Sequence, residues 1–327
     1  IYFIAKRIRN FGKVTVPDIF EARYGRTAAV LATITTVIAY LTIVSYQFRG
    51  GGKVLSMVSD GGISLEAGIV ITAVFAISYT VLAGMFSVVY TDVVNGVLMT
   101  IGTLTALGYM IYNVGGIGEI IEVADQAGKW SMFGNWSSER VGDISGPIIA
   151  ISFFVPTMLL LMGDANMYQR IFSAKDGGSA KKAVYFWIIG VFILESSISF
   201  LGLTGSVAAD KGLMPDLVGD SQAVVISEAT ESGIAPTDAD MLSARQSGSE
   251  SVIPAIAKHG GLPLIIGLLL VSTMMAIIVS TADSFLLIPA TNLTRDVYQR
   301  YINTKASEKQ ILFISRALVL VLGMIAY

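Results

Sequence analysis

The chain has 327 residues, of which 54% are hydrophobic and 14% are charged, and its mean hydropathy is +0.69. A soluble domain carries roughly 25% charged residues, so the composition excludes an ordinary soluble protein. The net charge is −2, and the sequence has no basic stripe or interleaved aromatic pattern, so a nucleic-acid-binding surface is set aside. The lack of cysteine and the single histidine, His259, exclude a disulfide framework and a metal site with several histidine or cysteine ligands.

Apolar runs long enough to cross a bilayer recur along the chain and predict an all-α polytopic membrane protein with about seven transmembrane helices. The predicted spans are residues 28–48, 66–83, 91–113, 147–163, 183–205 and 262–291, with a seventh span that begins near residue 311. We expect residues 1–327 to form a single transmembrane domain. Because the chain opens and closes inside apolar runs and does not begin with Met, we also expect it to be an internal fragment of a longer protein.

The segment TVPDIFEARYG, residues 15–25, comes before the first span and predicts a short cytoplasmic helix. Thr15 and Asp18 have the spacing of a capping box, in which each side chain hydrogen-bonds the backbone of the other residue. Pro17 suits the first turn of a helix, and Gly25 suits its end.

Lysine and arginine are divided unequally between the two ends of the predicted spans. Fourteen of these residues lie before the first span, between the fourth and fifth spans and between the sixth and seventh, whereas seven lie on the opposite side in longer loops. Cytoplasmic loops of membrane proteins are enriched in Lys and Arg, so the first group predicts the cytoplasmic side. Residues 206–260, rich in Asp, Glu and Ser, are then expected to form a long extracellular loop that contains a short helix.

Asp92 stands at the start of the predicted span 91–113 and has two interpretations. An acid at a helix N-terminus caps free N–H groups and is stabilised by the helix dipole. Alternatively, Asp92 is a stopping point for a cation at the inner mouth of a transport path. The residues alone favour helix capping.

Pro156 lies in the middle of the span 147–163 and predicts a break in that helix. A proline inside a membrane helix frees backbone groups, and secondary transporters often bind substrate at such discontinuous helices. Ser152 and Thr157 flank the break and are candidate substrate contacts. A simple kink is an equally good interpretation.

The stretch AIIVSTADSFLL, residues 276–287, concentrates polar side chains inside the sixth span. Ile277, Ser280, Thr281 and Ser284 fall on one helix face, where two hydroxyls and the Ile277 carbonyl form a patch of neutral oxygens. Such oxygens suit a monovalent cation such as Na⁺, and packing between helices is the alternative. Asp283 either faces a water-filled vestibule or pairs with Arg295 or a neighbouring helix.

Four sequence blocks together resemble the sodium:solute symporter family: TVPDIFEARYG, AGMFSVVYTDVVN (83–95), GDANMYQRIFSAKD (163–176) and AIIVSTADSFLLIPATNLTRDVY (276–298). The resemblance implies a LeuT-like bundle made of two inverted five-helix repeats. The seven spans correspond to bundle helices three to nine, so the bundle is incomplete and helices one and ten are missing. Ala83 and Asn95 depart from the family pattern of Gly and Gln, which indicates a divergent branch.

The resemblance also assigns roles to residues. It implies that the Ile277 carbonyl and the Ser280 and Thr281 hydroxyls bind sodium, and that Asp92 lies on the sodium exit path. Substrate-contacting positions of the family fall around Thr157, Leu160 and Leu161, next to the Ser152 already singled out. Two leucines at positions where the sugar transporters of the family have aromatic residues make a sugar a less expected substrate.

The expected function is sodium-coupled symport of a small organic solute, such as an amino acid, a carboxylate or a related nutrient, by alternating access. Na⁺ is the expected coupling ion, the partners are the solute, the sodium ion and the lipid bilayer of the cell membrane, and we expect no enzyme activity, no nucleic acid and no obligate protein partner. Two alternatives stay open: the membrane input module of a sensor histidine kinase, and a proton-coupled relative with the same fold.

Overall fold

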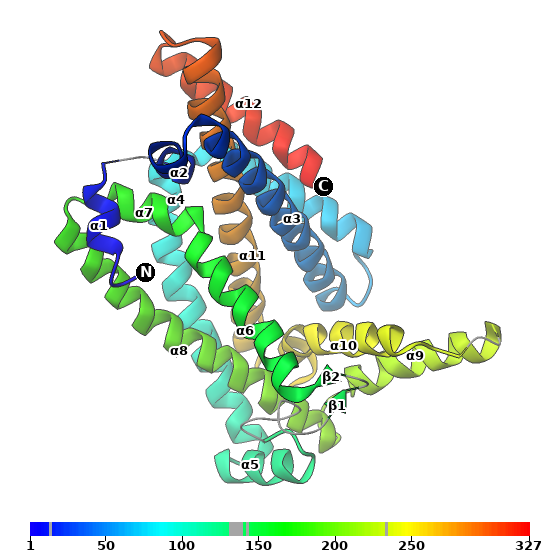
Figure 1. Ribbon diagram of the computed structural model, residues 1–327. Coiled ribbons are helices and arrows are strands. Elements are labelled where there is room, and N and C mark those ends of the chain that lie inside the picture. Colours follow the sequence, from blue (N-terminus) through cyan, green and yellow to red (C-terminus); the bar gives the residue numbers. More distant parts are fainter. Residues whose placement is uncertain (13–14, 131–139, 142–143, 233–234) are drawn as a thin grey trace.

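The computed structural model describes residues 1–12, 15–130, 140–141, 144–232 and 235–327, and this part of the chain is largely helical (Figure 1). Two very short strands pair antiparallel, with Arg140 opposite Ser145 and Val141 opposite Ile144. The elements in chain order are α1 (Ala5–Asn10), α2 (Val16–Tyr24), α3 (Arg26–Val58), α4 (Leu65–Val114), α5 (Ile117–Gln126), β1 (Arg140–Val141), β2 (Ile144–Ser145), α6 (Gly146–Gly163), α7 (Ala165–Ser173), α8 (Gly177–Asp210), α9 (Leu217–Ser232), α10 (Asp238–His259), α11 (Leu264–Asn292), the π-helix η2 (Leu293–Ile302) and α12 (Glu308–Ala326).

Six helical segments of the described residues are long and apolar enough to cross a membrane, and they match six of the seven predicted spans. These segments are Arg26–Val58, Leu65–Leu82, Tyr90–Val114, Gly177–Asp210, Leu264–Ile302 and Glu308–Ala326. The fourth predicted span forms α6, an apolar helix of 18 residues that is not among the six. The predicted helical membrane protein is therefore confirmed, and α6 stays a predicted span.

The second and third predicted spans are not separate helices but the two halves of α4. The chain stays helical between them, so the break expected near residues 84–90 is wrong. The two halves nevertheless diverge, because the middle of α4 lies near the top of Figure 1 while both of its ends lie lower.

Helix α11 stands in the centre of the molecule and packs along α3 and α4. A buried cluster that contains Val44 and Phe48 of α3, Ala76 of α4 and Leu286 of α11 also reaches α12 through Val319. Close approach of α4 to α11 depends on a glycine, because a Cβ atom at Gly102 would overlap the Thr273 hydroxyl. Small residues at such crossings are the usual means by which membrane helices pack tightly.

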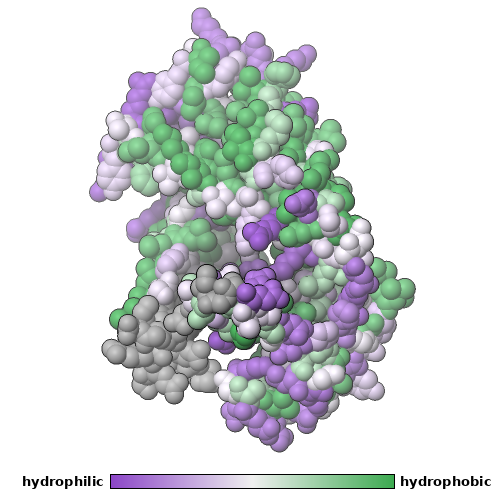
Figure 2. All heavy atoms as spheres, turned by 90° about the vertical axis from the view of Figure 1, so that its right-hand side faces the viewer, coloured by the Kyte–Doolittle hydropathy of each residue, from purple (hydrophilic) through white to green (hydrophobic). Residues whose placement is uncertain are grey.

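Residues 206–260 contain much more helix than expected. They end α8 and form α9 and α10, helices of 16 and 22 residues that pack against each other and project to the right of the bundle in Figure 1. The expectation of a single short helix is wrong, because the polar composition hides two helices, of which α10 begins with a capping box between Thr237 and Asp240. Figure 2 shows many hydrophilic side chains on the lower part of this face and a hydrophobic region above them.

Helix α2 forms as its sequence predicts. The Asp18 N–H donates to the Thr15 hydroxyl at 3.3 Å, the Thr15 N–H donates to the Asp18 carboxylate at 3.2 Å, and Gly25 ends the helix. The Thr15 hydroxyl also donates to the carboxylate of Asp296 on η2 at 3.3 Å. Thr15 is fully buried and Asp296 is 7% exposed, so this bond joins α2 to the end of α11 in a site shielded from water.

We expect Thr15→Ala to lower the thermal midpoint of the protein in detergent by a few degrees. The substitution removes a helix cap and leaves the buried Asp296 carboxylate without its hydroxyl donor, a loss of about 1–3 kcal/mol. Thr42→Ala is the matched control, since the exposed Thr42 hydroxyl donates only to the Ile38 carbonyl of its own helix. Equal melting of the two variants would contradict this role.

The three Lys- and Arg-rich segments lie at one end of the molecule. Helix α2, the region of α7 and the start of α8, and the connection from η2 to α12 all lie in the upper half of Figure 1, whereas α5, α9 and α10 lie below. This arrangement agrees with the predicted alternation of the spans. The assignment of the upper end to the cytoplasm stays a prediction.

Candidate ion site

The polar stretch of α11 faces the carboxylate of Asp92 on α4. The Ser280 hydroxyl donates to Asp92 Oδ1 at 2.6 Å, and the Thr281 hydroxyl donates to the carbonyl oxygen of Ile277 at 2.7 Å. The structure therefore brings together the predicted sodium ligands and the residue predicted for the exit path, although Asp92 lies 188 positions from Ser280 in the sequence.

Both hydroxyl protons are engaged in these bonds. A hydroxyl has one donor and two acceptor lone pairs, so the remaining capacity of Ser280 and Thr281 is for accepting, which is what a cation requires. The Ile277 carbonyl accepts the Thr281 hydroxyl in addition to the helical N–H bond of the same residue. It can join a cation site only after the Thr281 hydroxyl turns away.

The capping interpretation of Asp92 is wrong. Asp92 lies inside α4, where the backbone N–H groups are already used by the helix, and not at a helix N-terminus. Its side chain accepts from Ser280 and from Arg170 of α7, whose Nη2 lies 2.5 Å from Asp92 Oδ2. The same Arg170 nitrogen donates to the Ser284 hydroxyl at 3.2 Å, so one guanidinium joins α4 and α11.

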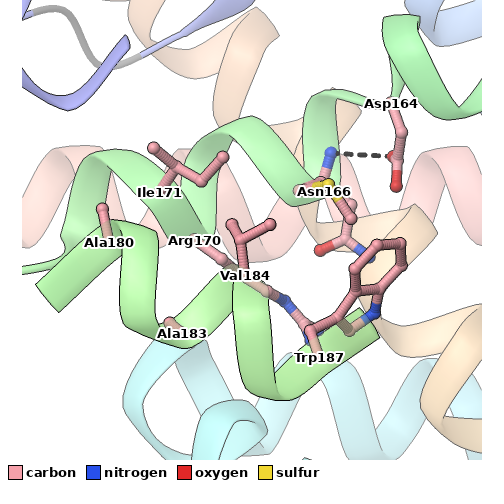
Figure 3. A pocket seen from close by; sticks show the side chains of 9 residues that line it. Asp164, Asn166, Arg170, Ile171, Ala180, Ala183, Val184 and Trp187 are labelled. Atoms are coloured by element: carbon pink, nitrogen blue, oxygen red, sulfur yellow. Dashed lines mark hydrogen bonds between the residues drawn. The ribbon is translucent and has the colours of Figure 1, made fainter. Parts of the chain in front are cut away.

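The position of Arg170 depends on how the N-terminus of its own helix, α7, is fixed to the rest of the bundle. The Asp164 carboxylate accepts the N–H of Asn166 at 3.0 Å and the hydroxyl of the buried Tyr40 on α3 at 2.8 Å. Figure 3 shows Asp164 and Asn166 at the start of α7, with the Arg170 side chain passing by Val184 and Trp187 of α8. These residues line a cavity of about 210 Å³ between α7 and α8.

Asp283 neither faces an open vestibule nor pairs with Arg295 among the described contacts. Its side chain is only 1% exposed, and one of its carboxylate oxygens has no hydrogen-bond partner in the described part of the chain. Thr80 and Asp92 are its neighbours on α4. Asp283 is thus directed from α11 toward the neighbouring helix α4, where the charge of Asp92 lies close, and a cation between the two carboxylates would offset their repulsion.

Helix α6 contains no break at Pro156, since it is continuous from Gly146 to Gly163. A proline removes one N–H and disturbs one turn, and here the helix continues through it. Ser152, Thr157, Leu160 and Leu161 are all exposed, Leu160 by 56% and Leu161 by 43%. The four cavities with described linings do not include these positions, which stay predicted substrate contacts.

Sequence reasoning missed the roles of Arg170, Ser284 and Tyr40. Arg170 stands in the block GDANMYQRIFSAKD, where it counted only as one of several basic residues on one side of the membrane. A signal was present for Ser284, which shares the face of Ser280 and Thr281. Tyr40 lies in an apolar run and carries no pattern that points to Asp164.

Comparisons with known proteins agree on the family. The model of the sodium:solute symporter family matches residues 1–327. The chain is 26% identical to the osmoregulated proline transporter OpuE of Bacillus subtilis and 25% identical to the sodium/proline symporter of Escherichia coli, over 99% of this chain and 59% of each relative. The sodium/pantothenate symporter of Escherichia coli is 26% identical over 64% of this chain and 41% of that protein.

A solved structure of a Na⁺-coupled sialic acid symporter, in a substrate-bound outward-open state, matches with a TM-score of 0.74 at 19% identity. The match covers 98% of this chain and 61% of the symporter, so it confirms the LeuT-like fold. The chain spans about three fifths of the length of the proline transporters that it matches. It is a multi-pass membrane protein, and it belongs to the sodium:solute symporter family.

Proposed function

We propose that the whole protein is a sodium-coupled symporter for a small organic solute, and that the cation binds at the Ser280 and Thr281 hydroxyls of α11. One observation carries the proposal. The Ser280 hydroxyl donates its proton to the Asp92 carboxylate, and the Thr281 hydroxyl donates its proton to a backbone carbonyl. Each hydroxyl oxygen then keeps lone pairs for a cation, and the nearby negative charge of Asp92 attracts it, in a membrane helix where polar side chains usually mark function.

Asp92 is proposed to receive the ion on its way to the inner side. Arg170 pairs with this carboxylate and also donates to Ser284, so it would block the ion between α4, α7 and α11. Alternating access requires the ion to leave on only one side at a time, and a removable cation at the inner mouth supplies such a barrier. Release would then require the Arg170 side chain to leave Asp92.

The test is uptake by the whole protein in liposomes, with a panel of radiolabelled solutes and three separate driving forces. An inward Na⁺ gradient is expected to accumulate at least one solute, and a K⁺ gradient of the same size is expected not to. Accumulation driven by a pH gradient in the absence of Na⁺ would favour the proton-coupled alternative. Failure of all gradients, together with Na⁺- or solute-dependent signalling by an attached kinase domain, would favour the sensor alternative.

A further inference from the structure

Arg170 is held at the candidate ion path by only one of its nitrogens. Its Nη2 lies 2.5 Å from Asp92 Oδ2 and 3.2 Å from the Ser284 hydroxyl. A guanidinium carries five N–H groups, and those on Nε and Nη1 have no acceptor among the described contacts. The side chain is also 51% exposed, and an ion pair that water reaches is weak. Arg170 can therefore leave Asp92 at a small cost in free energy if a second acceptor lies within reach.

Asp164 offers such an acceptor at the start of the same helix. Its Oδ1 accepts the Tyr40 hydroxyl at 2.8 Å and the Asn166 N–H at 3.0 Å. Its Oδ2 accepts no hydrogen bond among the described contacts, and the residue is only half-buried. One oxygen of this carboxylate thus fixes α7 to α3, and the other oxygen keeps its lone pairs for a cation.

Asp164 and Arg170 line the same cavity of about 210 Å³ between α7 and α8 (Figure 3). The two residues are six positions apart, which is about 9 Å along a helix axis. Side chains on a helix point toward its N-terminus, so a change of rotamer carries the guanidinium toward Asp164 without moving α7. The apolar walls formed by Ile171, Val184 and Trp187 suit the methylene stem of an arginine.

Asp283 is another carboxylate whose charge acts together with that of Arg170, but it does not suit this purpose. Its side chain is 1% exposed, and it is not among the residues that line the cavity. An arginine paired with Asp283 would stay between α4 and α11 and would keep the ion path closed. Movement to Asp164 instead takes the guanidinium away from α11 and into the space between α7 and α8.

We propose that Arg170 moves between two carboxylates, pairing with Asp92 while the inner path is closed and with Asp164 while the ion leaves. Asp164 is then a positioning residue for ion release. A Na⁺ ion that reaches Asp92 repels the guanidinium, and Asp164 replaces the ion pair that Arg170 gives up, so the two arrangements differ little in free energy. Each step therefore favours the other. The inference rests on the proposed function, because it names where the arginine that blocks the ion goes.

The experiment measures the Na⁺ dependence of solute uptake by the whole protein in liposomes, with Asp164→Asn made in two backgrounds. Asparagine keeps a carbonyl oxygen for Tyr40 and is a good helix cap, but its amide nitrogen cannot accept from Arg170. Arg170 then stays on Asp92, and the half-maximal Na⁺ concentration is expected to rise about two- to threefold, a modest shift because the pair is exposed. In Arg170→Met protein, the same substitution is expected to change nothing further, because no arginine is left to move.

Tyr40→Phe is the matched control. It removes the hydroxyl bond to Asp164 and leaves the carboxylate in place, so any shift that it causes should be the same with and without Arg170. Asp164→Ser, which also caps a helix but carries no charge, is the second variant and is expected to behave like Asp164→Asn. Half-maximal concentrations report only on protein that is inserted and active, so they do not depend on how much of a variant folds.

The outcomes separate this inference from the proposed function. A shift by Asp164→Asn and Asp164→Ser that depends on Arg170 supports the movement, because a purely structural Asp164 would give the same shift in both backgrounds. Equal shifts with and without Arg170, or no shift in either background, would overturn the movement and leave Na⁺-driven symport standing. If uptake by the unmodified protein does not depend on Na⁺, the proposed function fails and this inference fails with it.

Discussion

Replacing Ser280 and Thr281 together by alanine is expected to raise the Na⁺ concentration for half-maximal uptake by roughly thirtyfold. Each hydroxyl supplies one neutral oxygen, and the loss of a polar partner of this kind costs about 1 kcal/mol, so the pair contributes about 2 kcal/mol to ion binding. The Na⁺ dependence of solute uptake by the whole protein in liposomes measures the shift. The single variants should each give a smaller shift in the same direction.

Ser272→Ala is the matched control for this prediction. Ser272 lies on the same helix, is exposed, and its hydroxyl donates to the Leu268 carbonyl, with no hydrogen bond to Asp92 among the described contacts. If the double variant is inserted normally and keeps the Na⁺ dependence of Ser272→Ala, the hydroxyls pack α11 against its neighbours and do not bind the ion. The packing interpretation of residues 276–287 would then hold.

The helices of this fold could be predicted because long apolar runs have few alternatives in a bilayer. Residues 15–25 were also predictable, since the Thr15–Asp18 capping box is a local signal that needs no tertiary context. The bend of α4 was not, because apolarity falls near residue 83 while the backbone stays helical. Helices α9 and α10 could not be predicted because their polar composition resembles that of a loop. Their stability depends on packing against each other, which the sequence does not show.

The candidate site was predictable only as far as it lies on one helix. The spacing of Ile277, Ser280 and Thr281 places three oxygens on one face of α11 whatever surrounds them. Their partners come from α4 and α7, and no local pattern reveals that Arg170 meets Asp92 and Ser284.

Asp92→Asn and Arg170→Met are expected to change Na⁺ dependence in opposite directions. A cation bound to the Ser280 hydroxyl lies about 5 Å from the Asp92 carboxylate, where a unit charge is worth about 3 kcal/mol before screening at an effective dielectric constant of about 20. Asp92→Asn should therefore raise the half-maximal Na⁺ concentration about tenfold or more and slow Na⁺-dependent uptake. The Arg170 side chain is 51% exposed, so solvent weakens its competition with the ion to at most about 1 kcal/mol. Arg170→Met should then lower the half-maximal Na⁺ concentration by up to about fivefold.

The opposite signs separate an ion path from a structural ion pair. If Asp92 and Arg170 only hold α4 to α7, removal of either partner weakens the same contact, and both variants impair uptake in the same way. If Arg170 instead competes with Na⁺ for Asp92, its removal frees the carboxylate, and the half-maximal Na⁺ concentration falls. Arg300→Met is the control for the loss of an arginine at this end of the molecule. Arg300 forms ion pairs with Asp18 and Glu21 of α2 at 2.8 and 2.5 Å, and none of its described contacts involves Ser280 or Thr281. Shifts of equal sign for Asp92→Asn and Arg170→Met, or shifts no larger than that of Arg300→Met, would remove Asp92 from the ion path.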